Sequence, residues 1–157
     1  MSNQYVDIML EALAKKSKVL DRIINLNKQQ KILLNDPNLS PDDLETNINQ
    51  KAAAVDEILQ IDDGFEQVYE RVKDELNNNK ENYRDEIEKL KSLIREVTDK
   101  GQTVESQEAR NKDLVLKKFS TVREKAKTVR NSQRVLGSYA KMNNYVSDDP
   151  NFFDNKK

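Results

Sequence analysis

Histidine, cysteine and tryptophan are absent from this chain of 157 residues. Without His and Cys the protein has no imidazole general base, no thiol nucleophile and none of the nitrogen or sulfur ligands that zinc sites use. It also cannot form a disulfide. We therefore expect no enzymatic activity, no catalytic residues, no bound metal and no cofactor.

Turn residues and aromatic residues are scarce. The chain has only three Gly and three Pro, and aromatic residues make up 6% of it. A β-sandwich or barrel needs many more of both. Charged residues, by contrast, make up 35% and hydrophobic residues 36%. This composition is typical of long helices with polar outer faces, and the length favours one domain.

Long hydrophobic runs and an excess of one charge are also missing. No stretch approaches the roughly 18 consecutive apolar residues of a membrane-spanning helix, and the first residues lack the basic-then-apolar start of a signal peptide. The 27 Lys and Arg nearly balance the 28 Asp and Glu, so no global field steers the protein to nucleic acid or membrane. We expect a cytoplasmic protein with no direct membrane insertion.

What the sequence does contain is helical periodicity. Apolar residues recur at steps of three and four over residues 5–35, which predicts an amphipathic helix. Polar residues occupy the seam of this helix at Ser17, Asn27 and Lys31. The helix is expected to end before Pro37, because proline disfavours helical geometry at the residue before it.

A second periodic stretch begins after Ser40, which reads as an N-cap followed by proline at the first helical position. The three-four spacing then continues in phase to Glu108, with polar or small residues in the seam at Lys51, Asp62, Gly101 and Glu108, and it is completed from Val115 to Leu136. A four-residue step at Lys112 resembles a coiled-coil stutter.

This second stretch must fold back somewhere, because one helix over 41–136 would be roughly 140 Å long. Two breaks are plausible: the poor helix formers Asn77–Asn79 and the potential C-cap Gly101. Local signals alone favour Gly101. Asp62-Asp63-Gly64 is a weaker candidate, and as a calcium loop it would place Leu59 and Ile61 where carboxylates are required. We expect Asp62 to be a polar seam residue instead.

Basic residues concentrate near the C-terminal end of the periodic region. Residues 110–134 contain nine Lys or Arg and two acidic residues, whereas 41–99 contain 17 acidic and eight basic residues. A nucleic-acid-binding helix is disfavoured, because the only aromatic residue in 110–134 is Phe119, which lies in the apolar seam, and no binding motif accompanies it. We expect a face that is solvated or paired with the acidic helix.

The last part of the seam is built mostly from small apolar residues. This row is either ordinary bundle core or a face left open to accept a helix from a partner protein. In the second case Phe119 is the expected anchor. Beyond Gly137 the period is lost, so residues 137–157 are expected to be a flexible tail. The candidate partner-binding residues are Val115, Phe119, Val122, Ala126, Val129, Leu136, Tyr139 and Tyr145.

Three short stretches carry a resemblance to a known family. Asn49-Gln50-Lys51 leads into the helix around Ile58-Leu59, and Glu108-Ala109-Arg110-Asn111-Lys112 lies within the last helix. The chain ends in Phe153-Asp154-Asn155-Lys156-Lys157. With the opening helix of about thirty residues, these features resemble the FlgN-type flagellar export chaperones of Gram-positive bacteria.

The resemblance implies an all-α, elongated antiparallel three-helix bundle, which moves the preferred break to Asn77–Asn79. We expect helices over 5–35, 41–77 and 80–136, the first two forming a hairpin against the third, within a helical domain over 1–136.

The resemblance also implies a function. The long last helix would bind flagellar hook-associated proteins, keep them unassembled and deliver them to the cytoplasmic domain of the export gate, with Tyr139 or Tyr145 contributing to gate docking. Two alternatives stay open: a self-associating coiled-coil structural protein, and the filament-cap chaperone of the same export system.

Overall fold

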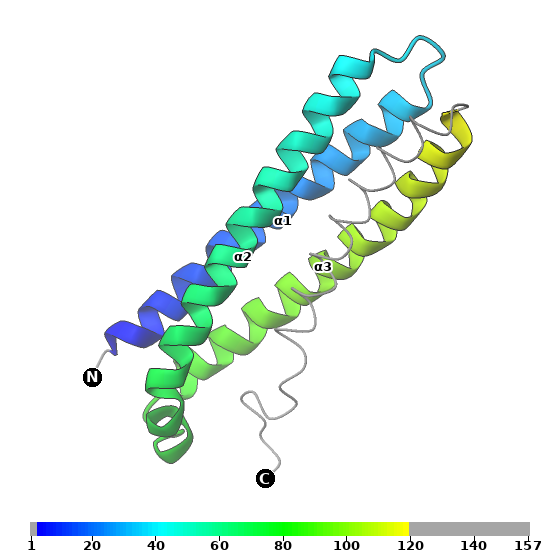
Figure 1. The fold of residues 1–157 in the computed structure, drawn as a ribbon. Helices are drawn as coiled ribbons and strands as arrows, with labels where there is room; N and C mark the ends of the chain where they lie inside the picture. Colours follow the sequence, from blue (N-terminus) through cyan, green and yellow to red (C-terminus); the bar gives the residue numbers. More distant parts are fainter. Residues whose placement is uncertain (1–2, 120–157) are drawn as a thin grey trace.

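The computed structural model describes residues 3–119, which form three long helices and no strand (Figure 1). Helix α1 spans Gln4–Leu34, α2 spans Pro41–Asn78 and α3 spans Arg84–Lys118. The all-α three-helix architecture expected from the sequence is confirmed. None of these helices is both long enough and apolar enough to cross a membrane.

The first two helices begin where side chains satisfy free backbone N–H groups. The Asn3 side chain accepts hydrogen bonds from the N–H groups of Tyr5 and Val6, at 2.8 and 3.4 Å. Ser40 accepts one from the N–H of Asp43 at 3.3 Å, and Pro41 occupies the first turn as predicted. Each cap satisfies a donor that has no partner within its helix.

Helix α1 is the central element of the bundle. Both α2 and α3 pack along α1, whereas α2 and α3 make no backbone contact with each other (Figure 1). Contacts such as Lys16 with Asp62 show that α1 and α2 are antiparallel, while Ser17 with Glu96 and Asn27 with Gln107 show that α1 and α3 are parallel. The expected hairpin of the first two helices exists, but the third helix packs on α1 and not on the hairpin as a whole.

The core follows the predicted seams. The main cluster runs the length of the bundle and includes the fully buried Leu20, Ile23, Ile58 and Leu90. Each such side chain contributes about 1.5–3 kcal/mol by leaving water. A second cluster, of Leu34, Leu44, Ile48 and Val115, closes the end where α1 stops and α2 begins.

The helix reversal lies at the asparagines. Helix α2 ends at Asn78, and Asn79 caps it by donating hydrogen bonds from its backbone and side chain to the carbonyl of Glu75, at 3.0 and 3.1 Å. Gly101 is buried within α3. The preferred boundary is therefore confirmed. The rival break at Gly101 is wrong, because a small residue packed in a seam can remain helical at a cost of only about 1 kcal/mol.

The expected extent of the last helix is wrong. It was predicted over 80–136, but α3 ends at Lys118, and Phe119 has extended backbone angles of φ −91° and ψ 126°. The Lys118 ammonium donates to the carbonyl of Asp36, and the Phe119 side chain packs on the second cluster. The end of α3 is thus attached to the α1–α2 connection, and the domain boundary predicted at 136 lies outside the described residues.

The structure also corrects the seam at two places. The predicted stutter at Lys112 is absent, because the buried positions run from Glu108 through Asn111 to Val115 with ordinary spacing. In α1, Gln30 is buried in place of the expected Lys31. In both cases an uncharged amide next to the predicted lysine enters the core. Gln30 accepts hydrogen bonds there from Lys51 and Asn111, and Asn111 donates from its amide nitrogen, while the Asn111 Oδ1 atom has no partner among the described residues.

Candidate partner-binding groove and buried polar layers

An apolar groove runs between the first half of α1 and the second half of α2. We call it the α1–α2 groove. Because the two helices are antiparallel, the N-terminal end of α1 lies beside the C-terminal part of α2 (Figure 1). The α1–α2 groove is lined by Tyr5, Ile8, Glu11, Ala12, Lys15, Glu57, Gln60, Ile61, Gly64, Phe65, Gln67, Val68 and Arg71.

Large apolar side chains remain accessible along this groove. Tyr5 is 41% exposed and Ile8 is 39% exposed. Across from them, Phe65 and Val68 of α2 are only half-buried. The Phe65 ring stacks on Tyr69 one turn later, with ring centroids 6.5 Å apart. Contiguous exposed apolar surface with a polar rim is typical of an interaction site.

Gly64 leaves a hollow along the groove. It lies well inside α2, where glycine is less favourable than alanine by about 1 kcal/mol. A Cβ atom built at this position would meet nothing within 4 Å. Packing therefore does not require glycine here, and the missing side chain leaves room that a partner's side chain can fill.

The rim of the groove carries both charge signs. Glu11 and Lys15 belong to α1, and Glu57 and Arg71 belong to α2. Arg22 holds the Glu57 carboxylate in an exposed ion pair of 2.7 Å. The chemistry of the groove thus suits an amphipathic helix with an apolar stripe, which is the helix-in-groove mode of recognition.

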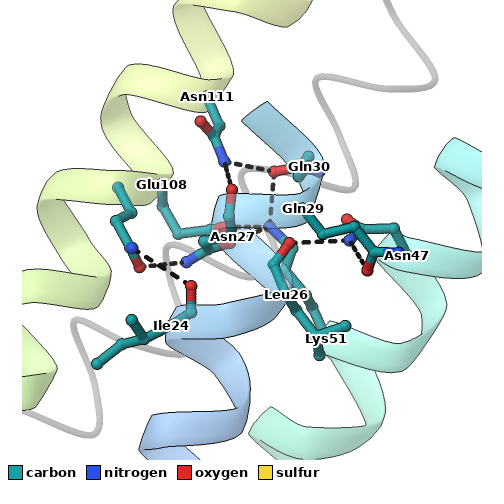
Figure 2. A network of polar contacts seen from close by, with 10 residues as sticks. Ile24, Leu26, Asn27, Gln29, Gln30, Asn47, Lys51, Glu108 and Asn111 are labelled. Atoms are coloured by element: carbon teal, nitrogen blue, oxygen red, sulfur yellow. Dashed lines mark hydrogen bonds and ion pairs between the residues drawn. The ribbon is translucent and has the colours of Figure 1, made fainter. Parts of the chain in front are cut away.

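A polar layer crosses the bundle nearer its other end (Figure 2). The Lys51 ammonium of α2 donates to Asn27 at 2.9 Å, to Gln30 at 3.0 Å and to the Glu108 carboxylate of α3. Asn111 donates to the Asn27 carbonyl and to the Gln30 side chain, each at 3.0 Å. All five residues are buried, and their mutual hydrogen bonds allow these polar groups to stay there.

A second polar layer lies nearer the middle of α1. Lys16 of α1 pairs with Asp62 of α2 at 2.8 Å, with both side chains almost fully buried. Next to Lys16, the Ser17 hydroxyl donates to Glu96 of α3 and accepts a 2.7 Å bond from Lys100. The sequence expectation that Asp62 is a polar seam residue is confirmed. Together the two layers fix the register of α2 and α3 on α1.

Burial dominates the electrostatics of both ion pairs. Loss of hydration raises the pKa of Glu108 and of Asp62 above their ordinary values, and the attraction of the paired lysine only partly opposes it. The same loss of hydration lowers the pKa of Lys51 and of Lys16. Each charged form is thus less favourable than in water, as expected where desolvation exceeds Coulombic gain.

The predicted partner-binding row does not form an open face where it is described. Val115 has 0% exposure, and Phe119 is half-buried against the same cluster. Val115 is therefore bundle core, which is the first of the two readings that the sequence left open. The others, Val122, Ala126, Val129, Leu136, Tyr139 and Tyr145, lie outside the described residues.

Sequence reasoning missed the α1–α2 groove. One signal could have revealed it: Tyr5, Ile8 and Ala12 follow a spacing of three and four residues displaced from the Val6–Met9–Leu13 seam. A second apolar stripe on the same helix indicates a second contact surface.

Comparisons with known proteins identify no relative. No family model, no curated protein and no solved structure matches the chain. Among residues 3–119, no group of three or more acidic side chains is placed to hold a metal ion.

Proposed function

We propose that this protein is a cytoplasmic chaperone of flagellar export that binds hook-associated proteins, prevents their premature assembly and delivers them to the export gate. The observation that carries the proposal is the α1–α2 groove, in which the accessible Tyr5 and Ile8 of α1 lie together with half-buried apolar residues of α2. The terminal sequence Phe153-Asp154-Asn155-Lys156-Lys157 supports the choice of client, through its resemblance to FlgN-type chaperones.

The groove suits a client that folds as it binds. Subunits that polymerise outside the cell have terminal segments that are disordered as monomers and become helical on assembly. A groove with apolar positions on both α1 and α2 can cover the apolar stripe of such a helix. Ordering the segment costs several kcal/mol, which moderates the affinity and allows the client to be handed over.

Delivery requires a second contact, with the cytoplasmic domain of the export gate. The resemblance places this contact in the C-terminal part of the chain, at Tyr139 or Tyr145. The client groove lies near the N-terminal end of α1 and uses neither tyrosine. Client binding and gate docking are therefore separable by mutation in this proposal.

The direct test is affinity purification of the protein from its native cytoplasm, with the bound proteins identified. We expect a flagellar hook-associated protein at a defined stoichiometry, and fewer flagella in a deletion strain. Recovery of the filament-cap protein instead would assign the chain to the sister chaperone. Recovery of self-oligomers alone, with normal flagellation in the deletion strain, would refute the chaperone proposal.

A self-associating structural role is the alternative from another class, because the same exposed groove could be covered by a second copy of the chain. Light scattering on the purified protein separates the two. A chaperone whose groove is free gives one molar mass across concentrations, whereas a self-associating protein gives a mass that rises with concentration.

A further inference from the structure

Within the described part of the chain, side chains connect α2 and α3, but the backbones of these two helices make no contact. Among residues 3–119, α1 is the helix that packs on α2 and also the helix that packs on α3. Lys51 and Glu108 nevertheless meet across the space between α2 and α3, with side chains only 3% and 2% exposed. Directly packed helices lie about 8–10 Å apart. The backbones of α2 and α3 do not make such contact, so the long side chains of Lys51 and Glu108 span the space between these helices.

The residues beside this ion pair are suited to contact with another apolar segment. On α2, Val55 and Leu59 follow Lys51 by one and two turns, and Val55 is buried while Leu59 is half-buried. On α3, Ile94 and Gly101 precede Glu108 by two heptads and one heptad and therefore share its face. We call this surface the α2–α3 face.

We propose that residues 120–136 of the same chain cover the α2–α3 face. Phe119 follows the last residue of α3 at the bundle end formed by Leu34, Leu44 and Ile48, and 38 residues follow it. A segment that turns back there and runs antiparallel to α3 reaches the Lys51–Glu108 pair near Val129. In helical form, 120–136 would extend about 25 Å, which carries it past this pair.

Charge complementarity favours this segment as the occupant. Helix α2 contains eleven Asp or Glu and three Lys or Arg, whereas residues 120–136 contain five Lys or Arg and one Glu. The most acidic helix would thus lie beside the most basic segment. Such pairing lowers the repulsion among the carboxylates of α2 and disfavours a parallel copy of α2 as the partner.

The apolar pattern of the segment agrees with an internal position. Val122, Ala126, Val129 and Leu136 recur at steps of three, four and seven residues, so in helical form they would share one face. Small side chains allow close approach to two helices at once. In this inference, the apolar row that the sequence analysis offered as a partner-binding site packs against the α2–α3 face of the same chain. This inference is independent of the proposed chaperone function.

Thiol cross-linking of the full-length chain tests the placement, since it has no native cysteine. Ala52 lies one turn after Ile48 and just before Val55, whereas the exposed Ala53 points to the opposite flank of α2. We expect a short bismaleimide to convert most of the Ala52→Cys/Val129→Cys protein to an intramolecular product and little of Ala53→Cys/Val129→Cys. Equal yields, no product, or a covalent dimer would overturn the proposal.

A stability measurement checks the same point without cross-links. Val122→Asp and Val129→Asp introduce a charge on the apolar row, and each is expected to lower Tm by about 5 °C or more. Asn131→Asp introduces the same charge on the opposite side of the row and serves as the matched control. Unchanged melting of all three variants, or equal losses in all three, would also overturn the proposal.

Discussion

Lys51 of α2 and Glu108 of α3 form a buried ion pair beside the central helix α1, although the backbones of α2 and α3 make no contact with each other. The pair is attached to α1 because the Lys51 ammonium also donates to Asn27 and Gln30. One side chain thus joins all three helices. Placement of α2 and α3 depends on this layer as well as on apolar packing.

Removing one partner of the Lys51–Glu108 ion pair should destabilise the fold much more than removing both partners. Lys51→Met leaves the Glu108 carboxylate buried without a cation and is expected to lower the free energy of unfolding by about 3–5 kcal/mol. In Lys51→Met/Glu108→Leu the unpaired charge is gone, so a smaller loss is expected. Urea denaturation measures both, and a double variant as unstable as the single one would contradict the account.

The raised carboxyl pKa values predict a pH dependence of stability. Between the ordinary pKa of Glu108, 4.5, and its higher native pKa, the folded protein binds more protons than the unfolded chain. The contribution of Glu108 to the free energy of unfolding therefore rises as pH falls through this window. Above the native pKa, the destabilisation that comes from burying the ionised Glu108 carboxylate is fully present. Asp62 behaves in the same way above its ordinary value of 3.8.

Glu108→Gln isolates this effect, because it removes the titration and keeps a similar shape. The free energy of unfolding of wild type and variant is measured by denaturation between pH 7 and about 4.5. As pH falls, the stability of the wild type should increase relative to that of the variant. A constant difference, or a shift in favour of the variant, would show that the native pKa of Glu108 is not raised.

Gly64→Ala should stabilise the fold. The new methyl group meets nothing within 4 Å, and alanine is favoured over glycine inside a helix by about 1 kcal/mol. We expect Tm to rise by about 2–4 °C, measured by circular dichroism.

In the proposed groove, Gly64→Phe should weaken client binding with no comparable loss of stability. Unaltered client affinity in Gly64→Phe would place the client elsewhere.

Phe119→Ala should affect stability and not recognition. The Phe119 ring packs on the cluster that contains the fully buried Val115, so a loss of about 1.5–3 kcal/mol is expected. Client affinity of the folded fraction should stay within about twofold of wild type. Weakened client binding with unchanged stability would restore Phe119 to the role of client anchor.

Much of this fold follows from the sequence. The seam spacing, Ser40-Pro41 and Pro37 predicted both ends of α1 and the start of α2 to within one residue, whereas the end of α2 at the asparagines was preferred over Gly101 only through the family resemblance. The end of α3 could not be predicted, because the periodic seam continues beyond Phe119 and the contact of Lys118 with Asp36, which accompanies this end, joins residues far apart in the sequence. Contacts between distant residues determine such an end, and a local pattern does not record them.

The candidate site was less predictable than the fold. Polar seam positions at Ser17, Asp62 and Glu108 were recognised, but their partners depend on how α2 and α3 align on α1. The α1–α2 groove requires two stripes on different helices to be brought side by side. The spacing of Tyr5, Ile8 and Ala12 indicates a second apolar stripe on α1, but the residues of α2 that lie opposite it are known only once the antiparallel register is known.

The most direct test of the central claim is the affinity of the purified chain for a purified hook-associated protein, measured by titration calorimetry on two variants of α1. Ile8→Ser alters the groove, where Ile8 is 39% exposed, and Ile32→Ser makes the same change outside it, where Ile32 is 71% exposed. We predict that Ile8→Ser weakens binding by about tenfold or more while Ile32→Ser leaves it unchanged. Equal affinities for wild type and both variants, or no binding by the wild-type chain, would contradict the account.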